Sequence, residues 1–343
     1  MNTKFLFLCL LFLCVSFFSF SQEQKREFSI MFYNVENLFD TVDNPLTLDE
    51  EFTPRGTRYW TNKRLNEKLL AVSKVIMNAS GFFPPDVVGL CEIENRFVLE
   101  RLIKGTPLKK YSYKIIHKES PDSRGIDVAL LYNSERIYPL NYNFYSIKNG
   151  DSLINTREIL YFSGIVDQKD TLHFFVNHWT SRYGGLLETK QNRAFAARTL
   201  RASVDSLFKD NKNSKIVILG DFNDQPTDIS LKNELMVLEP TVNFKNNQLY
   251  NLSQFWVGKE PGTLKFQSQW SVFDQIIVSG ALLGGNSGLL TKHENAKIIN
   301  LPFLLEKDER HGGIKPNRTY NGFSYKGGFS DHLPVMLKLY SVP

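Results

Sequence analysis

Carboxylates, amides and imidazoles, the side chains that carry acid–base and metal chemistry, stand at the ends of apolar runs in this 343-residue sequence. In KIVILGDFND, residues 215–224, a run that predicts a buried strand leads through Gly220 directly into Asp221 and Asn223. Residues two apart in an extended chain point to the same side, so these two side chains can share a target. We expect Gly220 to let the backbone approach a substrate. The other candidates border further apolar runs: Asn34, Glu92, His178, Asp274, Asp331 and His332.

The types of these side chains define a coherent chemistry. Asn34, Glu92 and Asp331 offer the hard oxygen atoms that suit Mg²⁺, with Mn²⁺ or Ca²⁺ as alternatives. The sequence has no Cys/His spacing typical of a zinc site. A hard cation on a phosphate oxygen neutralises the charge that grows when phosphorus is attacked. Asp221 can accept a proton from the attacking water, and Asn223 can hold that water or a phosphate oxygen.

Two histidines can assist such a reaction. Asp274 can hydrogen-bond one ring nitrogen of His332, which fixes the tautomer and favours a cationic ring that stabilises a phosphate gaining charge. His178 can act in the same way or protonate the leaving oxygen. Taken singly, asparagines and aspartates at strand ends are common turn formers, so the expected site depends on the whole set. The histidines without an acidic partner in a motif are expected in solvated loops: His117, His293 and His311.

The apolar runs that must position these groups recur along the chain. They predict strands over residues 28–35, 86–92, 113–117, 126–133, 159–166, 172–179, 215–221, 273–279 and 333–340. Two stretches, 62–80 and 186–210, carry apolar residues at helical spacing. Many strands with two long helices predict an α+β sandwich, with sheet packed on sheet and the helices outside. Because neighbouring ends of antiparallel strands meet, the polar groups are expected on one edge of that sandwich.

The N-terminal segment differs from the rest. Lys4 precedes the apolar stretch FLFLCLLFLCVSFFSF, and a small-x-small motif stands before Gln22. This pattern predicts a signal peptide over residues 1–21 and one exported domain, periplasmic or secreted, over residues 22–343. A membrane anchor is the alternative, although 16 apolar residues are short for a bilayer. Removal of the segment leaves Cys91 as the single cysteine, which excludes an intramolecular disulfide.

The order of the motifs resembles that of the endonuclease/exonuclease/phosphatase superfamily, the fold of pancreatic DNase. The matching segments are YNVENLF (33–39), LCEIEN (90–95), RGIDVALLY (124–132), VNHW (176–179), GDFND (220–224), FDQIIVS (273–279) and FSDHLPV (329–335). The resemblance spans residues 28–341. It implies a catalytic domain with a four-layer α/β/β/α sandwich, built on two packed, mainly antiparallel mixed sheets. It also implies metal-dependent cleavage of phosphoester bonds.

Residue by residue, the resemblance places Asn34 and Glu92 on the family's metal site. Asp221 matches the aspartate that activates water, and Asn223 the asparagine that positions phosphate. The identity of the formal base is not settled by this matching. We favour Asp221.

The remaining matches lie in the second half of the chain. Asp274 and His332 match the family's Asp–His pair, and Asp331 matches the aspartate before that histidine. His178 matches the strand-end histidine of DNase-like and sphingomyelinase-like branches. With Asp221 as the base, His332 is expected to stabilise the phosphate.

Three arginines are candidates for contacts with substrate phosphate. Arg124 precedes a predicted strand, Arg182 lies in a segment that resembles secreted bacterial nucleases, and Arg318 lies in a loop that mixes basic and aromatic residues. Each also suits a surface position. Residues 40–64, acidic first and then basic and aromatic, form either a lid on the substrate side or a surface excursion.

These observations predict an exported, Mg²⁺-dependent phosphodiesterase that cleaves DNA or RNA as a non-specific endonuclease. The net charge of +5 is compatible with phosphate-bearing substrates, and nothing resembles a base-reading module. No protein partner is implied. The alternative is a phosphatase or phosphodiesterase of small or lipid phosphoesters, sphingomyelinase-like or inositol-phosphatase-like. A binding module without catalysis is a third hypothesis, disfavoured because all the candidate residues are present.

Overall fold

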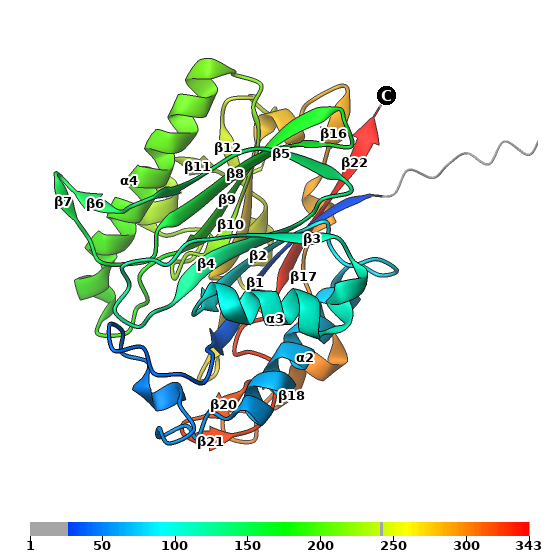
Figure 1. Cartoon of the computed structure of the whole chain (residues 1–343). Coiled ribbons are helices and arrows are strands. Elements are labelled where there is room, and N and C mark those ends of the chain that lie inside the picture. The colour runs from blue at the N-terminus through cyan, green and yellow to red at the C-terminus, as the bar shows by residue number, and fades with distance from the viewer. Residues whose placement is uncertain (1–26, 241–242, 343) are drawn as a thin grey trace, which may run out of the picture.

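The structure, a computed structural model, describes residues 27–240 and 243–342, so the predicted signal peptide lies outside the described residues. Within them, two seven-stranded sheets pack face to face (Figure 1). The strands of the first sheet are β1 (Phe28–Leu38), β2 (Val87–Ile93), β3 (Tyr113–His117), β4 (Asp127–Asn133), β16 (Gly288–Leu290), β17 (Ala296–Ile298) and β22 (Val335–Val342). Those of the second are β5 (Ile137–Tyr145), β8 (Ile159–Val166), β9 (Asp170–His178), β10 (Lys215–Asp221), β11 (Val237–Leu238), β12 (Leu249–Asn251) and β15 (Asp274–Ser279).

The outer layers are helical. Helices α2 (Asn62–Ala79) and α3 (Arg96–Gly105) cover the first sheet, and α4 (Leu186–Asp210) covers the second (Figure 1). Four two-stranded hairpins decorate the sandwich: β6 (Lys148–Asn149) with β7 (Ser152–Leu153), β13 (Leu264–Phe266) with β14 (Gln269–Ser271), β18 (Leu305–Lys307) with β19 (Ile314–Pro316), and β20 (Tyr320–Asn321) with β21 (Ser324–Tyr325). Short 3₁₀ or π turns occupy Glu50–Phe52, Pro107–Lys110, Ser230–Glu234, Leu252–Trp256, Gly280–Leu282, His293–Asn295 and Pro302–Leu304.

Both sheets are mixed but mainly antiparallel. The first runs in the order β16-β22-β1-β2-β4-β3, with β17 also paired to β22, and the second in the order β11-β12-β15-β10-β9-β8-β5. Each has a parallel pair near its centre, β1 with β2 and β9 with β10, and β11 is parallel to β12. The carboxyl ends of parallel neighbours lie together, so β1, β2, β9 and β10 deliver their last residues to one edge. The predicted fold class is confirmed.

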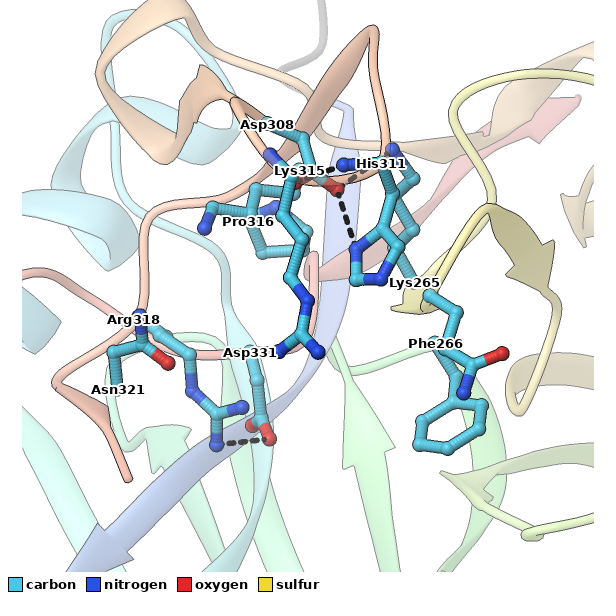
Figure 2. A pocket seen from close by; sticks show the side chains of 11 residues that line it. Lys265, Phe266, Asp308, His311, Lys315, Pro316, Arg318, Asn321 and Asp331 are labelled. Atoms are coloured by element: carbon cyan, nitrogen blue, oxygen red, sulfur yellow. Dashed lines mark hydrogen bonds and ion pairs between the residues drawn. The ribbon is translucent and has the colours of Figure 1, made fainter. Parts of the chain in front are cut away.

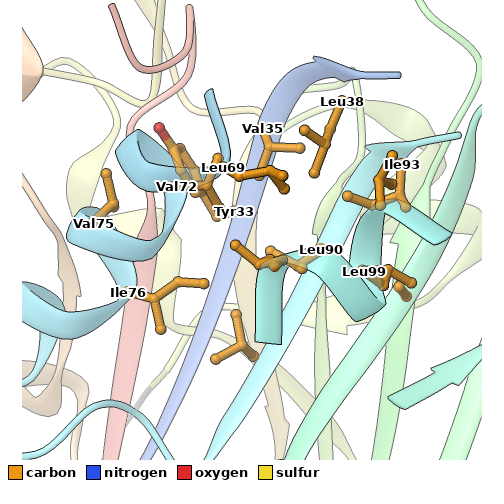
Figure 3. Packing of buried hydrophobic residues seen from close by; sticks show 14 of the residues in the cluster. Tyr33, Val35, Leu38, Leu69, Val72, Val75, Ile76, Leu90, Ile93 and Leu99 are labelled. Carbon is orange, nitrogen blue, oxygen red and sulfur yellow. The ribbon is translucent and has the colours of Figure 1, made fainter. Parts of the chain in front are cut away.

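Alternation along the strands explains the layers. In β1, Ile30 and Phe32 pack between the sheets, whereas Met31, Tyr33 and Val35 pack under the helices. The central strands are thus apolar on both faces and read as continuous apolar runs. One hydrophobic cluster lies between the sheets, one lies under α2 and α3 (Figure 3), and one lies under α4. These three clusters hold the four layers together.

Helix α3 and strand β5 are the longest elements that the sequence pattern missed. Helix α3 is short, but it has an N-cap, in which Asn95 Oδ1 accepts a hydrogen bond of 3.1 Å from Val98 N, and it buries Val98, Leu99 and Leu102. Strand β5 is an edge strand with mostly exposed residues and Pro139 within it, so it lacks an apolar run. No helix among the described residues has the length and apolar character needed to cross a membrane.

Candidate active site

The predicted residues meet at the edge where the strands end. In the second sheet Asp221 is the register partner of His178 on β9 and of Asp274 on β15, so three polar residues stand side by side on neighbouring strands. From the first sheet, Asn34 Nδ2 donates a hydrogen bond of 3.1 Å to Asp221 Oδ2. The chain segment before β22 adds His332, whose Nε2 lies 3.8 Å from the same carboxylate oxygen. The strand ends therefore form one cluster.

Asp221 lies at the centre of this cluster and is almost fully buried. Its Oδ1 accepts a hydrogen bond of 3.0 Å from Asn223 N, and its Oδ2 lies 3.7 Å from His178 Nε2. Burial raises the pKa of Asp221 to about 6; the charge of His332 opposes this rise and that of Asp274 adds to it. A carboxylate with such a pKa can exchange a proton near neutral pH, as a general base must.

His332 is held by Asp274, as predicted. The ring atom Nδ1 lies 2.7 Å from Asp274 Oδ2, and both side chains are buried. Burial lowers the pKa of His332, but the charges of Asp274 and Asp221 outweigh it and hold this pKa well above its usual value. Asp274 is itself fixed by Thr263, whose Oγ1 accepts a hydrogen bond of 3.1 Å from Asp274 N. The pair therefore presents an imidazolium next to Asp221.

His178 differs from His332 in its charge. Burial is the largest cause that keeps its pKa well below the usual value, and Arg157, Arg124 and His332 add to the effect. Both predicted roles of His178, stabilising charge as a cation and protonating the leaving oxygen, need the protonated ring, so both conflict with this environment. A neutral ring offers a hydrogen bond but neither a positive charge nor an acidic proton. Its Nε2 lies 3.7 Å from Asp221 Oδ2, so His178 remains a close neighbour of the central carboxylate.

Arg157 was missed by sequence reasoning. Its buried guanidinium donates hydrogen bonds to His178 O at 3.2 Å and to Trp179 O at 2.7 Å, and it pairs with Asp122 Oδ2 at 2.6 Å. It therefore fixes the end of β9 on which His178 stands. No motif surrounds Arg157 in the sequence, and its partners are distant along the chain, so no local signal marks it.

The predicted metal ligands, Asn34, Glu92 and Asp331, lie on the first-sheet side of the site. Glu92 Oε2 accepts a hydrogen bond of 2.9 Å from Asn37 N, and Oε1 lies 4.0 Å from His178 Nε2, too far for a hydrogen bond. Burial raises the pKa of Glu92; Arg124 opposes this, and the charges of Asp331 and Asp221 add to it. A set of oxygen donors with excess negative charge fits a hard divalent cation.

A second group of possible ligands consists of Asp221, Asp274 and His332, whose ligand atoms lie within 4.8 Å of one another. Here the imidazole Nδ1 is already engaged by Asp274, and the ring is held in its charged form. A charged imidazole has no lone pair for a metal. The oxygen set around Glu92 is therefore the better candidate.

Unusual backbone conformations aim the site residues. Glu92 has a φ of 60° at a bulge in β2, and Asn223 has a φ of 51° after β10. A second irregularity follows Asn34 in β1, where Glu36 has a φ of 54°. Bulges and left-handed residues redirect side chains at the cost of strain, and they concentrate at functional sites.

The loop before Asp331 is anchored by two residues that the sequence did not reveal. The buried Glu36 carboxylate accepts hydrogen bonds from Arg318 Nη2 at 3.0 Å and from Thr319 N at 2.7 Å. Lys68 on α2 donates to Thr319 Oγ1 and to the backbone of the same loop. Burial lowers the pKa of Lys68 to about 8, although Glu36 and Asp331 oppose this. The loop is thus tied to both β1 and α2.

The three predicted substrate arginines lie in different settings. Arg318 Nη2 also donates to Asp331 Oδ2 at 3.0 Å, which places it at the candidate metal site. Arg124 is partly exposed and lies close enough to lower the pKa of Glu92, so it borders the site. Arg182 donates to Asn223 O at 2.7 Å and pairs with Asp224 and Asp228, so it braces the loop that carries Asn223.

Two other expectations need correction. Gly220 approaches not a substrate but the neighbouring strand, because a Cβ there would lie 2.6 Å from Asn177 Cβ. His117 lies not in a solvated loop but in β3, where its buried ring nitrogen Nε2 is 2.9 Å from Asp127 Oδ2. Neither contact could be predicted from the local sequence, because Gly220 and Asn177, like His117 and Asp127, do not belong to one sequence motif.

Residues 40–64 run along the rim of the site. Leu48 N donates to Ser123 O at 2.8 Å, beside the Arg124 turn, and Arg58 donates to Gly322 O at 3.1 Å in the loop before Asp331. The segment also buries Trp60 completely in the cluster under α2. It therefore packs against the body of the protein on the substrate side.

Comparison with known proteins agrees with this architecture. The sequence matches the model of the endonuclease/exonuclease/phosphatase family over residues 29–341, so the chain belongs to this family. The predicted resemblance is confirmed. Members of the family are phosphoric ester hydrolases that use divalent metals, and the chain has their phosphoesterase fold. Among curated proteins, none matches this sequence.

Solved structures share the fold at low sequence identity. The human Nocturnin catalytic domain with bound sulfate has a TM-score of 0.55 and 15% identity, and the match covers 92% of this chain and 94% of that one. A mannosyl-6-phosphatase from Bacteroides thetaiotaomicron has a TM-score of 0.57 and 14% identity over 91% and 99% of the two chains. TDP2 from D. rerio, complexed with a single-strand DNA product, has a TM-score of 0.55 and 15% identity over 92% and 100%.

Proposed function

We propose that the protein is an exported, Mg²⁺-dependent phosphodiesterase that hydrolyses DNA or RNA with little sequence specificity. The observation that carries the hydrolytic chemistry is the position of Asp221. Its carboxylate lies 3.8 Å from the imidazole of His332, which is held in its charged form, and it is hydrogen-bonded to the candidate metal ligand Asn34. A base, a cation and a set of oxygen ligands thus converge on one point, as phosphoester hydrolysis requires.

Asp221 and Asn223 would act on the attacking water. Asn223 Nδ2 donates a hydrogen bond of 3.1 Å to Trp179 O, so the amide oxygen is left to accept a hydrogen bond from water. Of the two predicted roles of Asn223, this arrangement favours holding the water. Asp221 then takes the proton that the water loses as it attacks phosphorus.

Charge on the phosphate would be balanced from two sides. The imidazolium of His332 stabilises negative charge that grows on the phosphate oxygens, and Asp274 keeps the ring charged and oriented. A divalent cation held by Asn34, Glu92 and Asp331 would supply further neutralisation of that charge. His178, neutral and fixed by Arg157, offers a hydrogen bond to the phosphate or the leaving oxygen.

A nucleic-acid substrate is supported by the basic residues on the rim and by the shared fold. Arg124 and Arg318 both border the site, and each can contact a phosphate that flanks the scissile bond. Among proteins of the same fold, TDP2 from D. rerio is complexed with a single-strand DNA product. The sequence pattern of the N-terminal segment supports export.

A small phosphoester is the second candidate, and one observation favours it. The rim segment that reaches Ser123 carries the exposed acidic residues Asp43 and Glu50, together with Glu51, which pairs with Arg58 at 3.1 Å. Such a cluster repels a long polyanion but tolerates a compact one. The mannosyl-6-phosphatase of Bacteroides thetaiotaomicron shares the fold.

One experiment separates these candidates. Plasmid DNA and single-stranded RNA are digested with and without EDTA, beside sphingomyelin and a panel of sugar phosphates and nucleotides. We expect metal-dependent cleavage of at least one nucleic acid. Robust release of phosphate or head group from a small ester, with intact nucleic acids, would instead establish the second candidate.

A further inference from the structure

A pocket of about 370 Å³ opens beside Asp331, and its volume falls in the range of small-ligand sites. Three segments build it: the β13–β14 hairpin, the β18–β19 hairpin, and the loop that carries Arg318 (Figure 2). We call it the cationic pocket, because its lining includes the basic residues Lys265, Arg310, His311, Lys315 and Arg318.

The two carboxylates in the lining do not cancel this positive charge. Asp308 Oδ2 lies 3.0 Å from Lys265 Nζ, and Asp331 Oδ2 lies 3.0 Å from Arg318 Nη2. Arg310 makes no ion pair with any residue in 27–240 or 243–342. Lys315 has only Glu306, at 3.4 Å and partly exposed, and such surface pairs are weak. Arg310 and Lys315 are therefore available to a ligand.

The pocket is held in shape by Asp308. Its Oδ1 accepts hydrogen bonds from Arg310 N at 3.2 Å and His311 N at 3.1 Å, and its backbone oxygen accepts one of 2.8 Å from Gly312 N. Lys265, whose side chain is buried, donates to Asp308 and to Gly312 O at 2.7 Å, so the two hairpins are joined. The turn that presents Arg310 is therefore a built structure.

The cationic pocket is continuous with the candidate active site. Asp331, a candidate metal ligand, is part of its lining, and Arg318 connects Asp331 to Glu36. On the other wall, Leu264 precedes Lys265 and forms a backbone bridge with His332. A ligand in the pocket would thus lie next to a phosphate bound at Asp331 and His332.

We propose that the cationic pocket binds a second phosphate group of the substrate, next to the phosphate that is hydrolysed. Arg310 and Lys315 are the residues that recognise this group. Phe266, which lines the pocket and is 72% exposed, provides a flat apolar surface for the base or sugar between the two phosphates. The inference rests on the proposed function, since it presumes a phosphoester at the active site.

The proposal is tested by equilibrium binding in EDTA, in which hydrolysis is suppressed. Thymidine 3′,5′-bisphosphate is compared with thymidine 5′-monophosphate, and glucose 1,6-bisphosphate with glucose 6-phosphate. We expect the second phosphate to lower Kd by about tenfold in at least one pair, as charge-assisted contacts with two cations imply. A gain in the nucleotide pair alone indicates a polynucleotide as the source of the second phosphate, and a gain in the sugar pair alone indicates a small bisphosphate.

Variants of the lining residues test whether the cationic pocket causes the gain in affinity from the second phosphate. Arg310→Gln and Lys315→Gln should each reduce the gain to about threefold or less, and Phe266→Ala should weaken binding of both nucleotides but not of the sugars. The matched control is Lys307→Gln, on the same hairpin with an exposed side chain outside the lining, which should keep the full gain. Equal Kd values within both pairs, or a full gain in the Arg310→Gln/Lys315→Gln double variant, would overturn the proposal.

Failure of this inference is distinct from failure of the proposed function. Cleavage of plasmid or RNA with metal, together with equal Kd values within both pairs, contradicts the cationic pocket alone. A clear gain from the second phosphate in a protein that leaves nucleic acids intact contradicts the nuclease function and supports the pocket. Absence of measurable binding of either bisphosphate at millimolar concentration also overturns the inference.

Discussion

Asn34 and Asp221, 187 residues apart in the sequence, are joined by a hydrogen bond of 3.1 Å between β1, just before its irregularity, and the end of β10. Because these strands belong to different sheets, the bond connects the two halves of the sandwich at the catalytic edge. The first sheet supplies Asn34 and Glu92, and the second supplies His178, Asp221 and Asp274. The site therefore exists only when both sheets are packed in register with each other.

Replacing the central base or the cationic histidine should strongly reduce turnover. We expect Asp221→Asn and His332→Ala each to lower kcat by roughly 10²–10⁴-fold, because each removes a group that acts on the reacting atoms. Turnover of the best substrate is measured together with circular dichroism, which should show retained folding. Asp205→Asn, on the exposed side of α4, is the matched control. Wild-type rates in both site variants would show that the strand-end cluster is not the active site.

Activity should depend on a divalent metal ion and on the residues that bind it. EDTA should abolish activity and Mg²⁺ or Mn²⁺ should restore it, since oxygen donors dominate the site. Glu92→Gln should raise the Mg²⁺ concentration for half-maximal activity by about tenfold or more, because it removes a ligand charge. The measurement is a Mg²⁺ titration of activity in both proteins. Full activity in EDTA would refute the metal assignment.

Arg157 should contribute strongly to stability. Arg157→Met leaves the buried Asp122 carboxylate without its closest charge partner and removes the guanidinium donor from His178 O, whereas Trp179 O keeps the hydrogen bond from Asn223 Nδ2. We expect a loss of about 3–5 kcal/mol in the free energy of unfolding, because a buried charge is left unpaired. Urea unfolding provides the measurement. The double variant Arg157→Met/Asp122→Asn should recover part of the loss, because no unpaired charge remains. A cost below about 1 kcal/mol in the single variant would contradict this account.

Lys68 should make stability depend on pH in the alkaline range. Burial lowers its pKa to about 8 in the fold, against 10.5 for an ordinary lysine. Between these values the unfolded chain holds a proton that the folded chain has released, so stability rises with pH. The unfolding free energy of the wild type, relative to that of Lys68→Met, should therefore increase by about 2 kcal/mol from about pH 7.5 to about pH 9.5.

The comparison cancels the titrating groups that do not interact with Lys68, because both proteins share them. Lys63→Met, exposed on the same helix, is the control and should show no such trend. A difference that is constant over this pH range would mean that Lys68 keeps an ordinary pKa.

Export predicts a defined N-terminus. In cells that secrete the protein, mass spectrometry of the purified chain should find a start near Gln22, since a peptidase cleaves after the small-x-small motif. Cell fractionation should place the protein outside the inner membrane. An intact Met1 in a soluble cytoplasmic fraction would contradict the prediction.

The elements that could be predicted from the sequence are those with a distinct local pattern of apolar and polar residues. Continuous apolar runs identified the central strands, such as Lys215–Asp221, because both of their faces are buried. Polar residues bordering such runs pointed to Asn34, Asp221 and His332 only as a set, because each alone is an ordinary residue at a strand boundary. Strand β5 escaped because its residues are mostly exposed.

The supporting residues were unpredictable for a different reason. Lys68 reads as one polar position on an amphipathic helix, and its partner Thr319 stands 251 residues away. Arg157 likewise fixes Trp179 O and Asp122 only through the packed fold. Such contacts depend on which elements pack against each other in the fold, and the local sequence pattern does not show this packing. The Arg310 turn was hidden for the same reason, since its role depends on the neighbouring β13–β14 hairpin.

The left-handed backbone at Glu36 and Glu92 has a consequence for the evolution of this protein. Glutamate at a φ of 54° or 60° costs roughly 1–3 kcal/mol, and glycine would relieve most of that cost. At Glu36 the hydrogen bonds from Arg318 and Thr319 offset this cost, but at Glu92 burial also disfavours the charged carboxylate. Selection for thermal tolerance alone would therefore push position 92 toward glycine and remove a candidate metal ligand. Retention of Glu92 would mark lineages that still depend on catalysis, and its loss would mark relatives that have kept the fold for another purpose.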